Sequence, residues 1–61
     1  MEFSEEIKEI RKALGLSQRR LSKITGLPRR TVQDWEAGSF EPSTQFMRDA
    51  IIEKLKRLKI P

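Results

Sequence analysis

The amino-acid sequence predicts a small all-α domain made of four helices. Apolar residues recur at helical spacing in four segments, and no stretch shows the alternation of a β-strand. Three glycines and three prolines punctuate these segments, so the connections between the helices are short. The 61 residues include no cysteine and no histidine, which excludes disulfides and argues against a zinc or haem site. Such a chain must rely on a compact helical core, on oligomerisation or on both.

The first helix is expected to begin near Ser4 and to end at Gly15. Ser4 is a candidate N-cap, because its hydroxyl can accept a hydrogen bond from the free N–H groups of the first turn. Gly15 is placed to be the residue after the C-cap. One face of this helix carries the apolar residues Ile7, Ile10 and Leu14.

The second and third helices are short and follow each other closely. The second is expected to run from an N-cap at Ser17 to Gly26, with Leu21 and Ile24 as its apolar residues. A glycine in the left-handed conformation reverses the chain sharply, so the next helix should cross this one at a large angle. That geometry is a helix-turn-helix unit, over about residues 18–36. The third helix opens at Pro28 and ends at Gly38, with an apolar side made of Val32 and Trp35.

The fourth helix is expected to follow the loop SFEP, with Ser43 or Thr44 as its N-cap. Its apolar face is predicted to consist of Phe46, Met47, Ala50, Ile51, Leu55 and Leu58. Helical register also assigns four large residues to the core instead of a stacking or cofactor role: Phe3, Trp35, Phe46 and Met47. Three apolar residues fall outside these faces and either form a dimer patch or are scattered on the surface: Phe40, Ile52 and Ile60.

Basic charge is concentrated in one part of the chain. Residues 8–30 carry eight Lys or Arg against one acid, while the whole chain has a net charge of +4. Such segregation suggests a polyanionic partner. The alternative is that the charged residues, 36% of the chain, only keep a small domain in solution. No apolar run is long enough for a membrane span or a secretory signal, so a cytoplasmic location is predicted.

The stretch GLSQRRLSKITGLPRRTVQDWEAG, followed by EPS, resembles the phage-repressor and Cro-like helix-turn-helix domains, also called the xenobiotic-response-element (XRE) family. The resemblance implies one DNA-binding domain over residues 1–61, with four helices or as a truncated five-helix form. It also implies that the third helix enters the major groove of DNA and that dimers read palindromic operators. Three features depart from the family pattern: Ser22 replaces the usual alanine, the loop GSFEPS lacks basic residues, and the chain ends where a fifth, dimerising helix would begin.

Arg11 and Glu36 are expected to form a partly buried ion pair. Each lies on or beside an apolar stripe, where an unpaired charge is costly. The resemblance places an arginine–carboxylate pair at these positions, with Arg11 also oriented toward a DNA phosphate. The alternative is that both side chains reach out to solvent.

The outward face of the third helix is expected to contact DNA bases, as the resemblance implies. Arginine suits O6 and N7 of guanine, Gln33 suits adenine, and Asp34 can accept from cytosine N4 or orient Arg30. The expected base contacts are Arg29, Arg30, Gln33 and Asp34. The expected contacts with the DNA backbone are Gln18, at the N-terminus of the second helix, and Arg19, Arg20, Lys23 and Thr31. The alternative for the basic residues is a purely solvating role.

These observations predict sequence-specific binding of double-stranded DNA by a nucleoid-associated regulator of bacterial, phage or plasmid type, most simply a repressor. The protein is expected to act as a homodimer, in solution or only on DNA. The competing interpretation is a protein-interaction module, such as an antitoxin component or an engineered scaffold that keeps the fold. An enzyme is not expected, because the chain lacks histidine, cysteine and a glycine-rich phosphate loop. No cofactor, metal or small-molecule effector is indicated.

Overall fold

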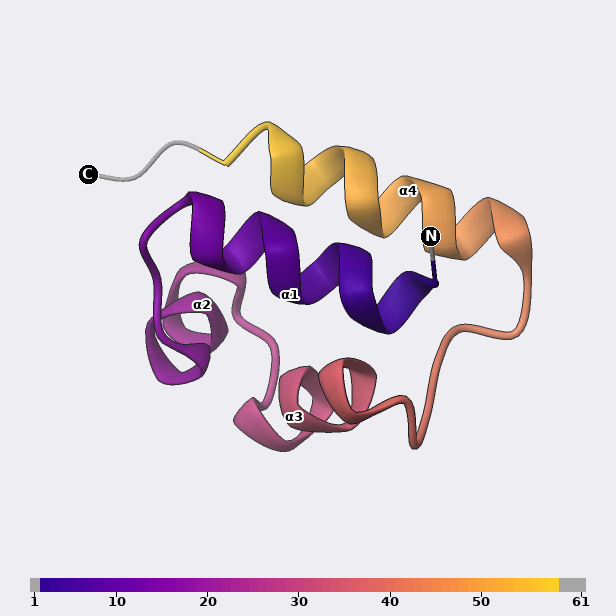
Figure 1. The fold of residues 1–61 in the computed structure, drawn as a ribbon, viewed down its shortest axis with the longest axis horizontal. Helices are drawn as coiled ribbons and strands as arrows, with labels where there is room; N and C mark the ends of the chain where they lie inside the picture. The colour runs from indigo at the N-terminus through magenta and orange to yellow at the C-terminus, as the bar shows by residue number, and fades with distance from the viewer. Residues whose placement is uncertain (1, 59–61) are drawn as a thin grey trace.

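The computed structural model describes residues 2–58, which form four α-helices (Figure 1). The helices are α1 (Phe3–Ala13), α2 (Gln18–Thr25), α3 (Arg29–Ala37) and α4 (Gln45–Lys56). α1 is the central element, because it contacts α3 on one side and α4 on the other, while α2 packs against α3. The predicted all-α, four-helix architecture with a helix-turn-helix is confirmed.

Two of the expected N-caps are present. The hydroxyl of Ser17 accepts a hydrogen bond from the backbone N–H of Arg20 at 3.0 Å, at the start of α2. The hydroxyl of Thr44 accepts from the backbone N–H of Met47 at 3.2 Å, at the start of α4. Each cap satisfies one of the backbone donors that a helix leaves free in its first turn.

The start of α1 was placed wrongly at Ser4. α1 begins at Phe3 with Glu2 at the N-cap position, so Ser4 lies within the first turn and caps nothing. The earlier start brings the ring of Phe3 into the core, where it meets Trp35 edge-to-face with 5.6 Å between ring centroids. Such an aromatic pair adds to the free energy gained by burial. α3 begins one residue later than expected, with Pro28 as its N-cap residue.

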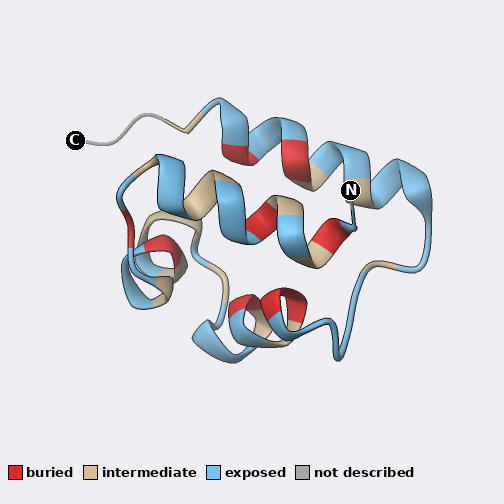
Figure 2. Ribbon diagram, viewed as in Figure 1, coloured by how far each residue is buried: buried red, intermediate tan, exposed pale blue. Residues whose placement is uncertain are grey.

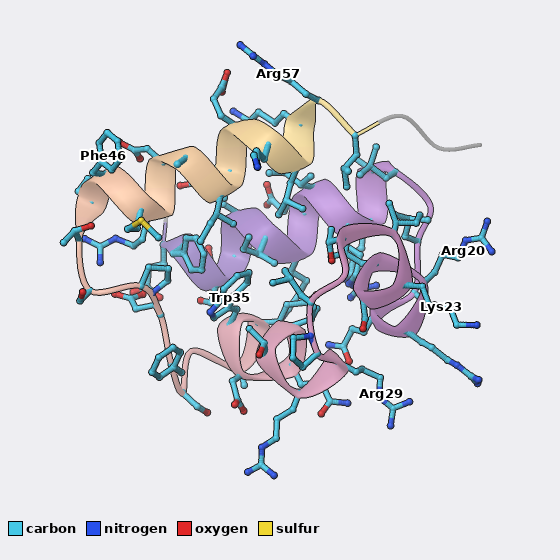
Figure 3. The ribbon with its side chains drawn as sticks, turned by 180° about the vertical axis from the view of Figure 1, so that it is seen from behind. Arg20, Lys23, Arg29, Trp35, Phe46 and Arg57 are labelled. Carbon is cyan, nitrogen blue, oxygen red and sulfur yellow. The ribbon has the colours of Figure 1, made fainter. Side chains whose placement is uncertain are left out.

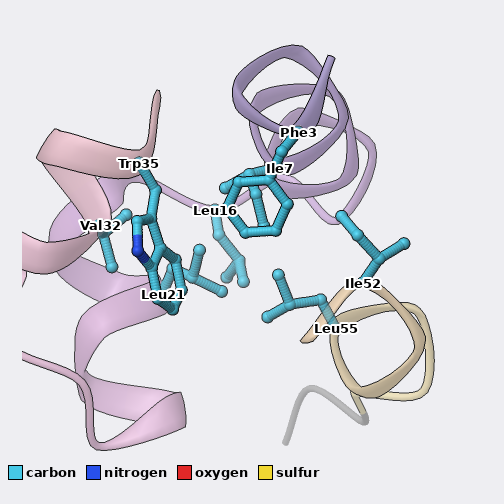
Figure 4. Close-up of a cluster of buried hydrophobic side chains, with 8 residues drawn as sticks. All are labelled: Phe3, Ile7, Leu16, Leu21, Val32, Trp35, Ile52 and Leu55. Atoms are coloured by element: carbon cyan, nitrogen blue, oxygen red, sulfur yellow. The ribbon is translucent and has the colours of Figure 1, made fainter. Parts of the chain in front are cut away.

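The core lies between α1 and the other three helices (Figures 2 and 4). Phe3 and Trp35 are buried in it, as predicted, and Leu16 joins them from the connection between α1 and α2. The buried apolar residues are Phe3, Ile7, Leu16, Leu21, Val32, Trp35, Ile52 and Leu55. Every helix therefore contributes to one contiguous core, which holds the helix-turn-helix against α1.

The predicted apolar face of α4 was only partly right: Leu55 is buried and Ile51 and Leu58 pack against the core, whereas the residues at the start of the helix do not. Phe46 and Met47 are 80% and 50% exposed, and Ala50 is exposed as well. Ile52, which had been placed outside the core, is buried with Leu55. Apolar residues make up half of this helix, so two stripes of helical period are possible, and α1 covers only one of them. At 3.6 residues per turn, Phe46 lies on the side of α4 opposite to that stripe.

A pair of substitutions tests which side of α4 is buried. Ile52→Val is expected to lower the free energy of unfolding by about 1 kcal/mol, because it removes a buried methyl group. Phe46→Ala, a much larger truncation, is expected to change it by less than about 0.5 kcal/mol because the ring is exposed. Urea unfolding followed by circular dichroism gives both values. The reverse order would show that α4 packs on its other face.

Candidate nucleic-acid interface

The turn between α2 and α3 is held by its own side chains. Gly26 adopts the left-handed conformation with φ of +75°, which a residue with a side chain adopts only with strain. The hydroxyl of Ser22 donates to the carbonyl of Leu27 at 2.6 Å, and that of Thr25 donates to the carbonyl of Leu21 at 2.7 Å. Ser22 therefore bonds across the turn, a contact that the alanine usual in the resembling domains cannot make. Contacts within the turn itself therefore fix the angle between α2 and α3.

α3 turns one face to the core and another to solvent. Val32, Trp35 and Glu36 are buried on the core side. Arg29, Arg30 and Gln33 are all exposed: Arg30 and Gln33 lie off the core side, and Arg29, in the first turn of α3, extends away from the protein in Figure 3. Of the other two α3 residues that were expected at DNA, Asp34 and Thr31 are half-buried. Asp34 lies 3.9 Å from Arg30 in a loose pair, in which the arginine side chain is 89% exposed and free to reorient.

The basic residues of α2 are on the surface of the same half of the molecule. Arg19, Arg20 and Lys23 are all exposed. Arg20 and Lys23 extend outward from α2, and Arg29 extends from the neighbouring end of α3 (Figure 3). The N-terminus of α2 adds backbone N–H groups and the positive end of a helix dipole, which favour a bound anion. This half of the protein therefore presents a positively charged surface.

Arg11 and Glu36 are brought together at the junction of α1, α2 and α3. The guanidinium of Arg11 donates from Nε to Oε2 of Glu36 at 2.7 Å and from Nη2 to Oε1 at 3.0 Å. Its Nη1 donates to the carbonyl of Leu16 at 2.9 Å. The side chains are 15% and 3% exposed, so this two-point pair is shielded from water. The arrangement ties the end of α1 to the end of α3.

Gln18 extends this network toward the surface. Its Nε2 donates to Oε1 of Glu36 at 3.2 Å, the oxygen that also accepts from Arg11. This contact was missed from the sequence, which indicated only a phosphate contact for Gln18. It fixes the amide group at the N-terminus of α2, and an amide nitrogen has a second N–H to donate.

The network holds Glu36 ionised. Burial on its own would raise the pKa of Glu36, but the hydrogen bonds from Arg11 and Gln18, with the positive charge of Arg11, outweigh it. The pKa of Glu36 therefore lies below its ordinary value of 4.5. The hydrogen bond to Glu36 likewise raises the pKa of Arg11, which stays charged.

A helix-turn-helix family model matches residues 7–49, from α1 through the whole helix-turn-helix to the first turns of α4. This match covers more than half of the chain. The chain belongs to the XRE family of helix-turn-helix domains. This XRE-family chain is therefore a DNA-binding domain of the transcription-regulator type, and its family is typically not enzymatic. No curated protein and no solved structure matches the chain.

The loop after α3 of this XRE-family domain is uncharged except for one residue. Phe40 is 63% exposed, and Glu41 lies 3.6 Å from Arg48 of α4. Arg48 also donates from Nη1 to the carbonyl of Pro42 at 2.7 Å. The expected dimer patch of Phe40, Ile52 and Ile60 does not form as a surface, because Ile52 is buried; Ile60 lies outside the described residues.

Within residues 2–58, no helix combines the length and apolar character needed to cross a membrane. The same range holds no group of three or more His, Cys, Asp or Glu residues arranged to bind a metal ion.

Proposed function

We propose that this XRE-family domain recognises a specific double-stranded DNA sequence by placing α3 in the major groove and that it acts as a transcriptional repressor of bacterial, phage or plasmid type. The observation that carries the proposal is the division of α3 into a buried side and an exposed polar side next to the basic residues of α2. The major groove is wide enough for one α-helix, and each base pair presents a distinct pattern of donors and acceptors there. A bound α3 blocks polymerase sterically.

Base reading is assigned to the exposed face of α3. Arg29 and Arg30 can each donate two hydrogen bonds to guanine, and Gln33 can pair with adenine. Asp34 is only half-exposed and lies near Arg30, so its role is to orient that guanidinium or to accept from a cytosine amino group.

Backbone contact is assigned to residues around α2. Gln18 is oriented by Glu36 and lies at the N-terminus of α2, which suits a phosphate oxygen. Arg11 is 15% exposed beside it and adds positive charge to that phosphate site. The remaining contacts to the phosphates are proposed for Arg19, Arg20, Lys23 and Thr31.

The proposal extends to the assembly on DNA. Residues 1–61 act as one DNA-binding unit in the cytoplasm, associated with the nucleoid. Two copies occupy the halves of a palindromic operator, as the two-fold symmetry of helix-turn-helix dimers on DNA requires.

Selection of bound duplexes from a random pool, followed by a salt titration, tests the function. We expect a palindromic consensus, and a binding constant that falls steeply with salt, with a log–log slope of about −3 or steeper per copy. Arg20→Ala with Lys23→Ala is expected to flatten the slope by about 1–2 without changing the consensus. A binding constant that does not respond to salt would contradict DNA binding and favour a protein-interaction module.

A further inference from the structure

Ser22 is bonded to two consecutive residues of the turn between α2 and α3. Its carbonyl accepts a hydrogen bond from the backbone N–H of Gly26 at 2.9 Å, and its hydroxyl donates to the carbonyl of Leu27 at 2.6 Å. Leu27 directly precedes Pro28, the N-cap residue of α3. The hydroxyl of Ser22 therefore connects the middle of α2 to the residue that leads into α3.

The other polar contacts of this turn are weaker or do not cross it. The N–H of Leu27 donates to the hydroxyl of Thr25 at 3.4 Å, which is long for a hydrogen bond. The same hydroxyl makes its short bond, of 2.7 Å, to the carbonyl of Leu21 within α2. Pro28 has no N–H to donate. Among residues 2–58, apart from apolar packing, the start of α3 therefore depends on one short hydrogen bond for its attachment to α2.

The two ends of α3 are attached to different helices. The last turn of α3 is tied to α1 by the two hydrogen bonds between Glu36 and Arg11. The start of α3 is tied to α2 by the hydroxyl of Ser22. Arg30 and Gln33, to which base reading is assigned, lie between these attachments. Loss of the Ser22 hydroxyl would leave the last turn in place and free only the start of the helix.

A small tilt of α3 is enough to disturb base contacts. Arg30 lies six residues before Glu36, which is about 9 Å along the helix axis at 1.5 Å per residue. A tilt of about 10° around the attached end moves the backbone of Arg30 by about 1.5 Å. Hydrogen bonds between nitrogen and oxygen span only about 0.5 Å, from 2.7 to 3.2 Å. The basic side chains of α2 do not move with α3, so their phosphate contacts are unaffected.

We infer that Ser22 is a positioning residue for base reading: its hydroxyl fixes the tilt of α3 and thereby raises discrimination between DNA sequences. This role rests on the proposed function and deepens it. The resembling domains usually carry alanine at this position, so the fold itself does not require the hydroxyl. Gly26 and Pro28, on either side of Leu27, are exposed, and water can therefore replace the hydroxyl at the carbonyl of Leu27.

Competition between the selected duplex and a scrambled one tests this role in the parent, Ser22→Ala and Thr25→Val. The measured quantity is the ratio of the two affinities. Partial unfolding does not change this ratio, because it lowers both affinities by the same factor. Ser22→Ala should lower the ratio at least about fivefold, as the weakening of one base contact does, and should leave the affinity for the scrambled duplex within about twofold of the parent value.

Thr25→Val is the matched control. It removes a hydroxyl from the same turn, but one whose short hydrogen bond stays within α2, so the ratio should remain within about twofold of the parent value. Both variants should melt within about 10 °C of the parent, since each loses a single hydrogen-bonding group.

Three results are decisive against a positioning role or against DNA recognition. A parental ratio in Ser22→Ala, including the case in which both affinities fall by one factor, would overturn the inference and leave Ser22 a structural residue. Equal losses of the ratio in Ser22→Ala and Thr25→Val would overturn it as well, because the bond across the turn would then have no special effect. A parent chain that does not distinguish the two duplexes would count against the proposed function instead.

Discussion

Glu36→Ala is expected to lower the free energy of unfolding by about 3–5 kcal/mol, because it leaves the guanidinium of Arg11 shielded from water without its partner. For a domain of this size that loss approaches the whole stability, so the variant should be largely unfolded at moderate temperature. The side chain of Glu36 is 3% exposed and accepts three hydrogen bonds, two from Arg11 and one from Gln18. Urea or thermal unfolding followed by circular dichroism measures the change.

Glu41→Ala is the matched control. Glu41 also pairs with an arginine, but its side chain is 53% exposed and the nearest atoms are 3.6 Å apart. Water screens such a pair, so its loss should cost less than about 1 kcal/mol. Equal and small effects for Glu36→Ala and Glu41→Ala would show that the Arg11–Glu36 pair does not stabilise the fold.

The pH dependence of stability reports the same pair. The pKa of Glu36 is lower in the folded protein than in the unfolded chain, so ionised Glu36 favours folding. Its contribution is complete above the ordinary value of 4.5 and is lost as the pH falls through the lower pKa of the folded state. Glu36→Gln should therefore remove part of the acid sensitivity of the parent, as measured by urea unfolding over a range of pH values.

A double Arg29→Ala and Gln33→Ala variant is expected to lose most of its preference for the selected sequence. Each base contact contributes about 1–3 kcal/mol of discrimination, so the pair should cost about 2–6 kcal/mol if the effects add. Both side chains are exposed, so the unfolding free energy should stay within about 0.5 kcal/mol of the parent value. Competition between the selected duplex and a scrambled one measures the discrimination.

Arg20→Ala with Lys23→Ala separates affinity from specificity. Loss of two phosphate contacts should weaken binding to both duplexes by a similar factor and leave their ratio unchanged. If the Arg29/Gln33 variant also kept the ratio of the parent, α3 would not be the element that reads the sequence.

Local signals in the sequence predicted most of the fold. Ser17, and Ser43 or Thr44, were predicted as caps because side-chain capping depends on a few neighbouring residues, and the sharp turn between α2 and α3 was predicted from Gly26. The burial of Ile52 instead of Phe46 was not predictable in the same way. Both stripes of α4 have helical period, and only the position of α1 decides between them.

In the candidate site, too, features set by local sequence could be predicted and features set by contacts between distant residues could not. The exposed side of α3 could be predicted because Val32 and Trp35 define its buried side. The contact of Gln18 with Glu36 joins residues 18 positions apart, and the pairing of Arg48 with Glu41 depends on how the loop before α4 is folded. Neither contact has a pattern in the sequence, because each depends on the path of the chain between the helices.

Oε1 of Glu36 accepts hydrogen bonds from both Arg11 and Gln18. A single atom therefore belongs both to the interior of the domain and to the proposed phosphate-binding site at the N-terminus of α2. The structural role and the proposed binding role of Glu36 therefore cannot be changed independently, whether by evolution or by engineering. A substitution that loosens Gln18 also weakens the attachment of α1 to α3. The reverse coupling follows by thermodynamic linkage, since a phosphate that fixes Gln18 also favours the folded state. An operator duplex should therefore raise the melting temperature of the domain as well as occupy its surface.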